Sequence, residues 1–138
     1  MSGTWTVHRA AAVAVGGALG ASVRWAVVTA AAPTSFPWPV LVLNIAGSVL
    51  LGIAMAEEWS HPAARLALHD AGGIGFCGGL TTFSTFAVEV VDLARDDRAT
   101  TAAVYLVASV VGAIAGVVVG AAALHSVRAL TLPLEEQP

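Results

Sequence analysis

Four long apolar stretches alternate with short polar connections along this chain. The apolar stretches cover residues 10–32, 40–56, 71–91 and 102–124. A helix needs roughly 20 apolar residues to cross a bilayer, with about 17 as the lower limit. The pattern therefore predicts four transmembrane helices, of which the second is the shortest and could extend at either end.

The polar connections carry residues that interrupt helices. The first contains Pro33, Pro37 and Pro39, which remove backbone donors and restrict their neighbours. Residues 57–70 are polar and contain Pro62, and residues 92–100 hold five charged side chains: Asp92, Arg95, Asp96, Asp97 and Arg98. The sequence thus predicts one all-α integral membrane domain over residues 1–138, with a flexible tail over residues 126–138.

The composition agrees with a membrane protein. The chain has 138 residues, is 57% hydrophobic and only 11% charged, and its mean hydropathy is +0.82. A soluble domain carries about 25% charged residues. The net charge is −3 and lysine is absent, so the basic face that a nucleic-acid partner requires is missing. We expect the lipid bilayer as a partner and no nucleic acid.

The first apolar stretch has a second interpretation, as a cleaved secretory signal. Arg9 precedes an alanine- and valine-rich run that ends in three alanines. Arg24, however, lies where such a signal is neutral, and Pro33 follows the cleavage position. We therefore interpret this stretch as a membrane span.

A few isolated residues have structural interpretations. Trp38 and Trp59 bracket the second stretch and are predicted to be interface anchors, as Trp5 and Trp25 could be, with core packing as the alternative. Cys77 is the only cysteine, so it forms no intrachain disulfide, and we interpret it as a small buried side chain. The four histidines share no metal-ligand spacing and are interpreted as solvated.

Small and polar residues share faces of the predicted helices. One face of the second helix carries Asn44, Gly47, Ser48 and Gly52. In the first helix, Gly16 and Gly20 are four residues apart. In the fourth helix, residues spaced by four or nearly four positions are Tyr105, Ser109, Gly112, Gly116 and Gly120. Such faces predict close helix packing. The Asn44 amide either bonds across helices or faces a wet cavity, and both alternatives stay open.

The third helix contains the segment GFCGGLTTFSTF, residues 75–86. Two adjacent glycines weaken a helix, and Thr81 and Thr82 can bond locally to the backbone. A break at membrane depth is tolerated only where it is buried in protein or lines water. We predict a third helix that is broken near its middle. Phe83 and Phe86 then either line a site with their positive ring edges or merely pack the kink.

The charge distribution bears on topology and on mechanism. With four spans, Arg9, Arg65 and Arg128 share one side and Arg95 and Arg98 the other. Three against two imposes almost no orientation, which favours an antiparallel dimer. A proton-coupled transporter needs an acidic side chain deep in the membrane. The first, second and fourth stretches have none, and Glu89 lies near the end of the third.

The segment GFCGGLTTFSTF closely resembles the signature of the CrcB/Fluc fluoride channel family. Residues 17–24 resemble the first-helix pattern G-x-x-G-A-x-x-R, and residues 44–48 resemble the second-helix pattern N-x-x-G-S/A. Residues 105–112 resemble the polar track of the fourth helix. The resemblance extends from Gly16 to Gly120. One departure is Ala113, where some members carry another hydroxyl, which could shorten the polar track.

The resemblance implies a passive channel that exports cytoplasmic fluoride and confers fluoride resistance, and not an enzyme. It implies a dual-topology antiparallel dimer in the bacterial plasma membrane, either a homodimer or a heterodimer with a paralogous chain. The implied fluoride pathway consists of Asn44, Phe83, Phe86, Ser84, Thr85, Tyr105 and Ser109. The backbone carbonyls of Gly78 and Thr81 would hold a structural sodium ion.

Three other functions agree less well with this sequence. A small four-helix proton-coupled antiporter would need an acid deep in the first helix, which this sequence lacks. A non-transporting membrane assembly protein would explain the glycine faces, but not Asn44 together with the broken third helix. An enzyme is disfavoured because the sequence offers no nucleophile–base pair and no metal cluster.

Overall fold

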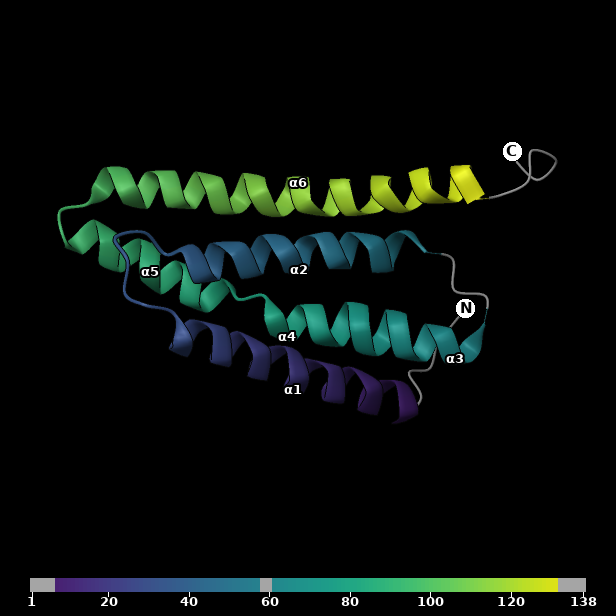
Figure 1. Ribbon diagram of the computed structural model, residues 1–138. Helices are drawn as coiled ribbons and strands as arrows, with labels where there is room; N and C mark the ends of the chain where they lie inside the picture. Colours follow the sequence, from purple (N-terminus) through teal and green to yellow (C-terminus); the bar gives the residue numbers. More distant parts are fainter. Residues whose placement is uncertain (1–6, 58–60, 132–138) are drawn as a thin grey trace.

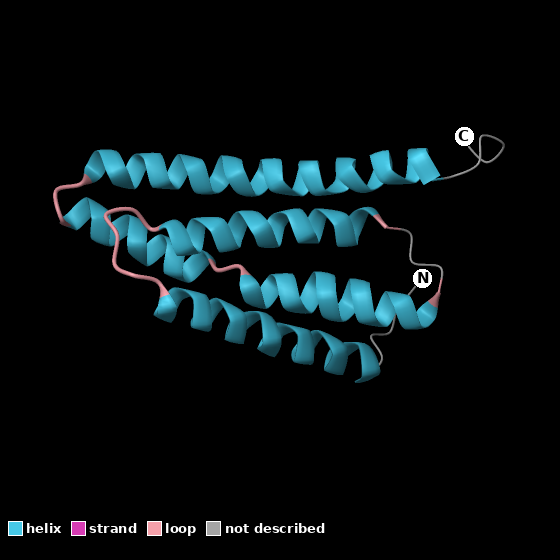
Figure 2. Cartoon of the chain, viewed as in Figure 1, coloured by secondary structure: helices cyan, strands magenta, loops and turns pink. Residues whose placement is uncertain are grey.

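The computed structural model describes residues 7–57 and 61–131, and these residues form helices joined by short connections (Figures 1 and 2). Four spans are long and apolar enough to cross a membrane. They include α1 (Val7–Ala30), α2 (Trp38–Ala56) and α6 (Ala99–Thr131). The spans run lengthwise beside one another, with α2 next to α6 and α4 next to α1 (Figure 1). The prediction of an all-α protein with four membrane spans is confirmed.

The third span, Pro62–Arg95, is composite. It begins with the short α3 (Pro62–Ala64) and continues as η1 (Arg65–Cys77), a π-helix, and α4 (Gly78–Leu80). After α4 the backbone of Thr81 and Thr82 is extended, with ψ of 154° and 123°. The helix resumes as α5 (Phe83–Arg95) in a new direction (Figure 1). The predicted break near the middle of the third helix is confirmed.

The helices are longer than the apolar stretches that predicted them. The polar stretch 57–70 is not a loop throughout, because Pro62 starts a helix that passes through Arg65 and Asp70. Proline suits this first helical position, since its fixed φ is helical and its missing donor is not needed there. At the other end, α6 remains helical to Thr131, past the predicted start of the tail. Residues 132–138, like Trp5 and Trp59, lie outside the described residues.

A buried ion pair explains why polar residues join the third span. Asp70 is fully buried, and its carboxylate accepts hydrogen bonds from Nε of Arg9 at 2.6 Å and from Nη2 at 3.0 Å. His69 Nδ1 lies 2.8 Å from the same carboxylate. Because the charges compensate one another, this end of η1 packs against α1. The interpretation of His69 as a solvated side chain was wrong, since it is half-buried in this cluster.

Glycines let α1 approach the third span at backbone distance. A Cβ atom at Gly16 would lie 2.0 Å from the carbonyl oxygen of Ala71, and one at Gly20 would lie 2.1 Å from that of Phe76. On the opposite side of this contact, a Cβ atom at Gly79 would lie 2.2 Å from the carbonyl oxygen of Gly17. Such distances exclude any side chain at these positions. The predicted packing role of Gly16 and Gly20 is confirmed.

The second close pair is α2 with α6. A Cβ atom at Gly120 would lie 2.1 Å from the carbonyl oxygen of Val49, and one at Gly52 would lie 2.2 Å from that of Val117. A Cβ atom at Gly116 would lie 3.1 Å from the carbonyl oxygen of Ile45. The close packing predicted for the glycine stripe of the fourth helix is confirmed, and its partner is α2. The predicted face of α2 is divided, because Gly52 contacts α6 whereas Gly47 contacts Thr81 of the break.

The close approach of α1 predicts different outcomes for two neighbouring glycines. Gly20→Ala should lower the free energy of unfolding by about 2 kcal/mol or more, because backbone atoms occupy the space of the new methyl group. Gly17→Ala is the matched control, since its Cβ atom would meet only the carbonyl oxygen of Gly75 at 3.7 Å. Unfolding in mixed detergent micelles measures both. Equal stability of the two variants would contradict this account of the α1 contact.

Candidate functional site

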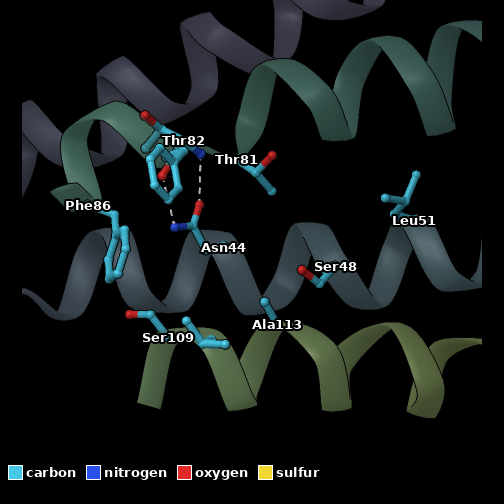
Figure 3. A pocket seen from close by; sticks show the side chains of 10 residues that line it. Asn44, Ser48, Leu51, Thr81, Thr82, Phe86, Ser109 and Ala113 are labelled. Atoms are coloured by element: carbon cyan, nitrogen blue, oxygen red, sulfur yellow. Dashed lines mark hydrogen bonds between the residues drawn. The ribbon is translucent and has the colours of Figure 1, made fainter. Parts of the chain in front are cut away.

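A pocket of about 280 Å³ opens beside the break of the third span. We call it the break pocket. Its wall combines α2, the extended residues, the start of α5 and the middle of α6, as Figure 3 shows. The lining residues are Asn44, Ser48, Leu51, Thr81, Thr82, Phe83, Phe86, Ser109, Val110 and Ala113. Thus four of the seven predicted pathway residues, Asn44, Phe83, Phe86 and Ser109, line one cavity.

Asn44 pairs with the backbone of the break through both ends of its amide (Figure 3). Its Oδ1 accepts from the Thr82 backbone N–H at 2.8 Å, and its Nδ2 donates to the Thr82 carbonyl at 3.1 Å. An asparagine amide carries two N–H donors, so the second hydrogen of Nδ2 stays available at the pocket wall. Both alternatives left open by the sequence therefore apply: Asn44 bonds across helices and also lines a cavity.

The hydroxyls after the break start α5. The Thr82 side chain accepts from the Thr85 backbone N–H at 3.2 Å, which is the geometry of an N-cap. Its hydroxyl also lies 3.3 Å from that of Ser84 and 3.1 Å from that of Thr85. Ser84 and Thr85 contribute to this cap and do not line the break pocket. Their role in a pathway stays a prediction.

The aromatic residues form a row that leads away from the pocket. The Phe83 and Phe86 ring centroids are 5.8 Å apart, and Phe86 in turn lies 5.4 Å from Tyr105. Phe83 is 79% exposed, whereas Phe86 is buried. Tyr105 is also buried, and its hydroxyl donates to Glu89 Oε2 at 2.5 Å. Tyr105 therefore supports Phe86 from behind and does not line the break pocket.

One hydroxyl on the pocket wall lacks a partner. Ser109 is buried, and its Oγ makes no hydrogen bond of normal geometry within the described part of the chain; its neighbour Tyr105, whose hydroxyl interacts with it, donates to Glu89 instead. A buried polar group without a partner costs about 1–3 kcal/mol. A polar guest in the pocket would remove this cost. Ala113, one turn further along α6, offers no such group, so the polar wall of α6 ends at Ser109 as the sequence suggested.

The break also releases backbone carbonyls. In a continuous helix the amide of Thr82 would bond the carbonyl of Gly78, and that of Thr85 would bond the carbonyl of Thr81. Here these amides bond Asn44 and the Thr82 hydroxyl instead. The freed Thr81 carbonyl accepts from Nη1 of Arg24 at 2.9 Å. The sequence alone assigned Arg24 no role. Its position, four residues after Gly20, places it on the same face of α1 and could have indicated that it contacts the third span.

These features define a class. A chain of four spans, with one span broken near its middle beside a pocket that polar side chains partly line, is a multi-pass membrane protein with a cavity at a helix break. Irregular backbone at this depth occurs in channels and transporters, where it lines such cavities.

The family follows from comparison with known proteins. Residues 11–121 match the family model described as CrcB-like protein, Camphor Resistance (CrcB). The chain therefore belongs to the CrcB family, as the motif of residues 75–86 suggested.

Three relatives are each named a fluoride-specific ion channel, FluC or FluC 2. The protein of Bordetella petrii is 40% identical over 117 residues, which are 85% of this chain and 91% of the relative. The FluC 2 protein of Rhodococcus jostii is 43% identical over 109 residues, which are 78% and 91%. The protein of Idiomarina loihiensis is 43% identical over 111 residues, which are 76% and 83%. These relatives and the four spans fit a multi-pass protein of the bacterial membrane.

The Asn44 pairing makes a testable prediction about the break. Asn44→Ala should lower the free energy of unfolding by about 2–3 kcal/mol, because two backbone groups of Thr82 lose their partner. It should also accelerate hydrogen exchange at the Thr82 amide, measured by NMR in micelles. Ser48→Ala, in the same pocket one turn further along α2, is the matched control. Unchanged exchange at Thr82 would show that the pairing does not hold the break.

Proposed function

We propose that this protein is a passive fluoride channel that exports cytoplasmic fluoride down its electrochemical gradient. The observation that best supports this proposal is the break pocket, which is lined both by hydrogen-bond donors without a full set of partners and by aromatic rings. The Ser109 hydroxyl and the second Nδ2 hydrogen of Asn44 are available there. The names of the relatives, fluoride-specific ion channels, support fluoride as the transported ion.

The chemistry of the pocket suits a small anion. Fluoride is strongly hydrated, so it enters an apolar medium only if other donors replace part of its water shell. Hydroxyl and amide donors do this, and the positive edges of Phe83 and Phe86 add a weaker attraction. Conduction also requires that binding stay weak enough for release. Such transport forms and breaks no covalent bond, and the membrane potential drives it.

A structural sodium ion belongs to this proposal. The freed carbonyls of Gly78 and Thr81 are oxygen ligands of the kind a hard cation accepts. One lone pair of the Thr81 carbonyl serves Arg24, and a carbonyl oxygen has two. Bound there, sodium would supply a fixed positive charge between two pathways. Two carbonyls are fewer ligands than a hard cation takes, so this site would need a second copy to become complete.

An antiparallel dimer is the assembly that this site favours. Phe83 is 79% exposed at the break, and Gly78 is exposed with open space where its Cβ atom would lie. A second copy would cover both residues and bring the two breaks together. The nearly even arginine distribution permits both orientations in the membrane. The name FluC 2 borne by one relative keeps a heterodimer with a paralogous chain as the alternative.

The function predicts selective fluoride efflux. Liposomes that hold the purified protein and fluoride should empty when a potassium ionophore removes the charge build-up, as followed with a fluoride electrode. Chloride-loaded liposomes should retain their anion. Phe86→Ile, Phe83→Ile and Asn44→Asp should each reduce the fluoride rate at least tenfold, since each removes an electropositive edge or donor. Equal chloride release, or dependence on a proton gradient, would refute the channel proposal.

The assembly predicts insertion in both orientations. A single cysteine in residues 132–138, in a Cys77→Ala background and without any paralogous chain, should react with an impermeant reagent from both sides of the membrane. A cysteine in residues 96–98, at the opposite end of α6, should also react from both sides, because each orientation of the chain exposes it on a different side. Labelling from one side only would rule out dual topology for this chain and leave the heterodimer standing.

A further inference from the structure

One face of α1 follows the third span from its buried acid to its break. Arg9, Gly16, Gly20 and Arg24 occur at intervals that place them together on a helix. Arg9 binds the Asp70 carboxylate, the glycines pack against backbone, and Arg24 binds the Thr81 carbonyl. The two arginines thus fix α1 to both ends of the segment from Asp70 to Thr81.

Arg9 and Arg24 differ in whether an acidic side chain compensates their charge. Arg9 pairs with the Asp70 carboxylate, as Arg128 in α6 pairs with Glu57. Arg24 has no ion-pair partner within the described part of the chain, and its guanidinium donates to a neutral carbonyl, that of Thr81. A guanidinium stays protonated in proteins. An uncompensated positive charge therefore lies, half-buried, directly behind a residue that lines the break pocket.

An isolated charge at this depth is costly and points to a function. The carbonyl of Thr81 is freed only because the helix breaks there, so Arg24 and the break depend on each other. Asn44 holds Thr82 from α2, and Arg24 holds Thr81 from α1. The break is therefore fixed from two sides by two side chains of different charge.

We propose that Arg24 is a positioning residue for the anion pathway, which fixes the Thr81 carbonyl and supplies the positive charge that favours an anion in the break pocket. The inference rests on the proposed fluoride function for its ligand, but the Arg24–Thr81 contact stands apart from it. Its electrostatic part predicts that charge matters more than hydrogen-bonding capacity at this position.

Two substitutions separate charge from hydrogen bonding. Arg24→Lys keeps the positive charge and loses the planar donor group, whereas Arg24→Gln keeps donors and loses the charge. In the liposome assay over a range of fluoride concentrations, Arg24→Gln should raise the half-saturating concentration about tenfold, because it removes a positive charge whose attraction for an anion is screened less in a protein than in water. Arg24→Lys should stay within about threefold of the wild type. Ser22→Ala is the control on the same helix, since its hydroxyl bonds only within α1.

A second measurement tests the contact without transport. Protein labelled with ¹³C at threonine carbonyls and ¹⁵N at arginine side chains should show a dipolar contact between Thr81 and Arg24 by solid-state NMR, which is lost in both variants. A purely structural role would impair Arg24→Lys as much as Arg24→Gln, and that result would overturn the electrostatic part. Absence of the contact in the wild type would overturn the positioning role. Contact without any wild-type fluoride flux would instead refute the fluoride function alone.

Discussion

Backbone groups that lie in a membrane must find partners within the protein, because lipid offers none. This constraint governs the break between α4 and α5, where two extended residues interrupt the helical ladder. Asn44 bonds both backbone groups of Thr82, and the Thr82 hydroxyl bonds the amide of Thr85. Arg24 bonds the carbonyl of Thr81. The break is stable because three side chains replace the hydrogen bonds that it removes.

The rest of the fold brings these side chains to the break. Glycine contacts hold α1 against the third span, so that Arg24 reaches Thr81. A second set of glycine contacts holds α2 against α6, which places Ser109 opposite Asn44 in one pocket. The buried Arg9–Asp70 pair fixes the far end of η1. Tight packing and the polar site are therefore parts of one arrangement, since the donors converge only where the helices touch.

Much of this arrangement was predictable from local pattern. Apolar length predicted the four spans, glycine spacing predicted which helix faces pack closely but not their partners, and the segment from Gly75 to Phe86 predicted both the break and the family. Long-range pairing was not predictable. Asp70 looked like a loop residue because its partner, Arg9, lies 61 positions away in the sequence. Tyr105 shares the spacing of Ser109, yet Glu89 draws its hydroxyl away from the pocket, and spacing alone does not show this.

The proposed fluoride function depends on donors at the break that hold the anion. The most direct test is solid-state NMR of the protein in lipid, with ¹⁵N in asparagine side chains and ¹⁹F detection of fluoride. Asn44 is the only asparagine in the chain, so its side-chain signal is unambiguous. The account predicts a dipolar contact between Asn44 Nδ2 and bound fluoride that excess chloride does not remove. Fluoride transport without such a contact would show that the ion passes elsewhere and would contradict the account.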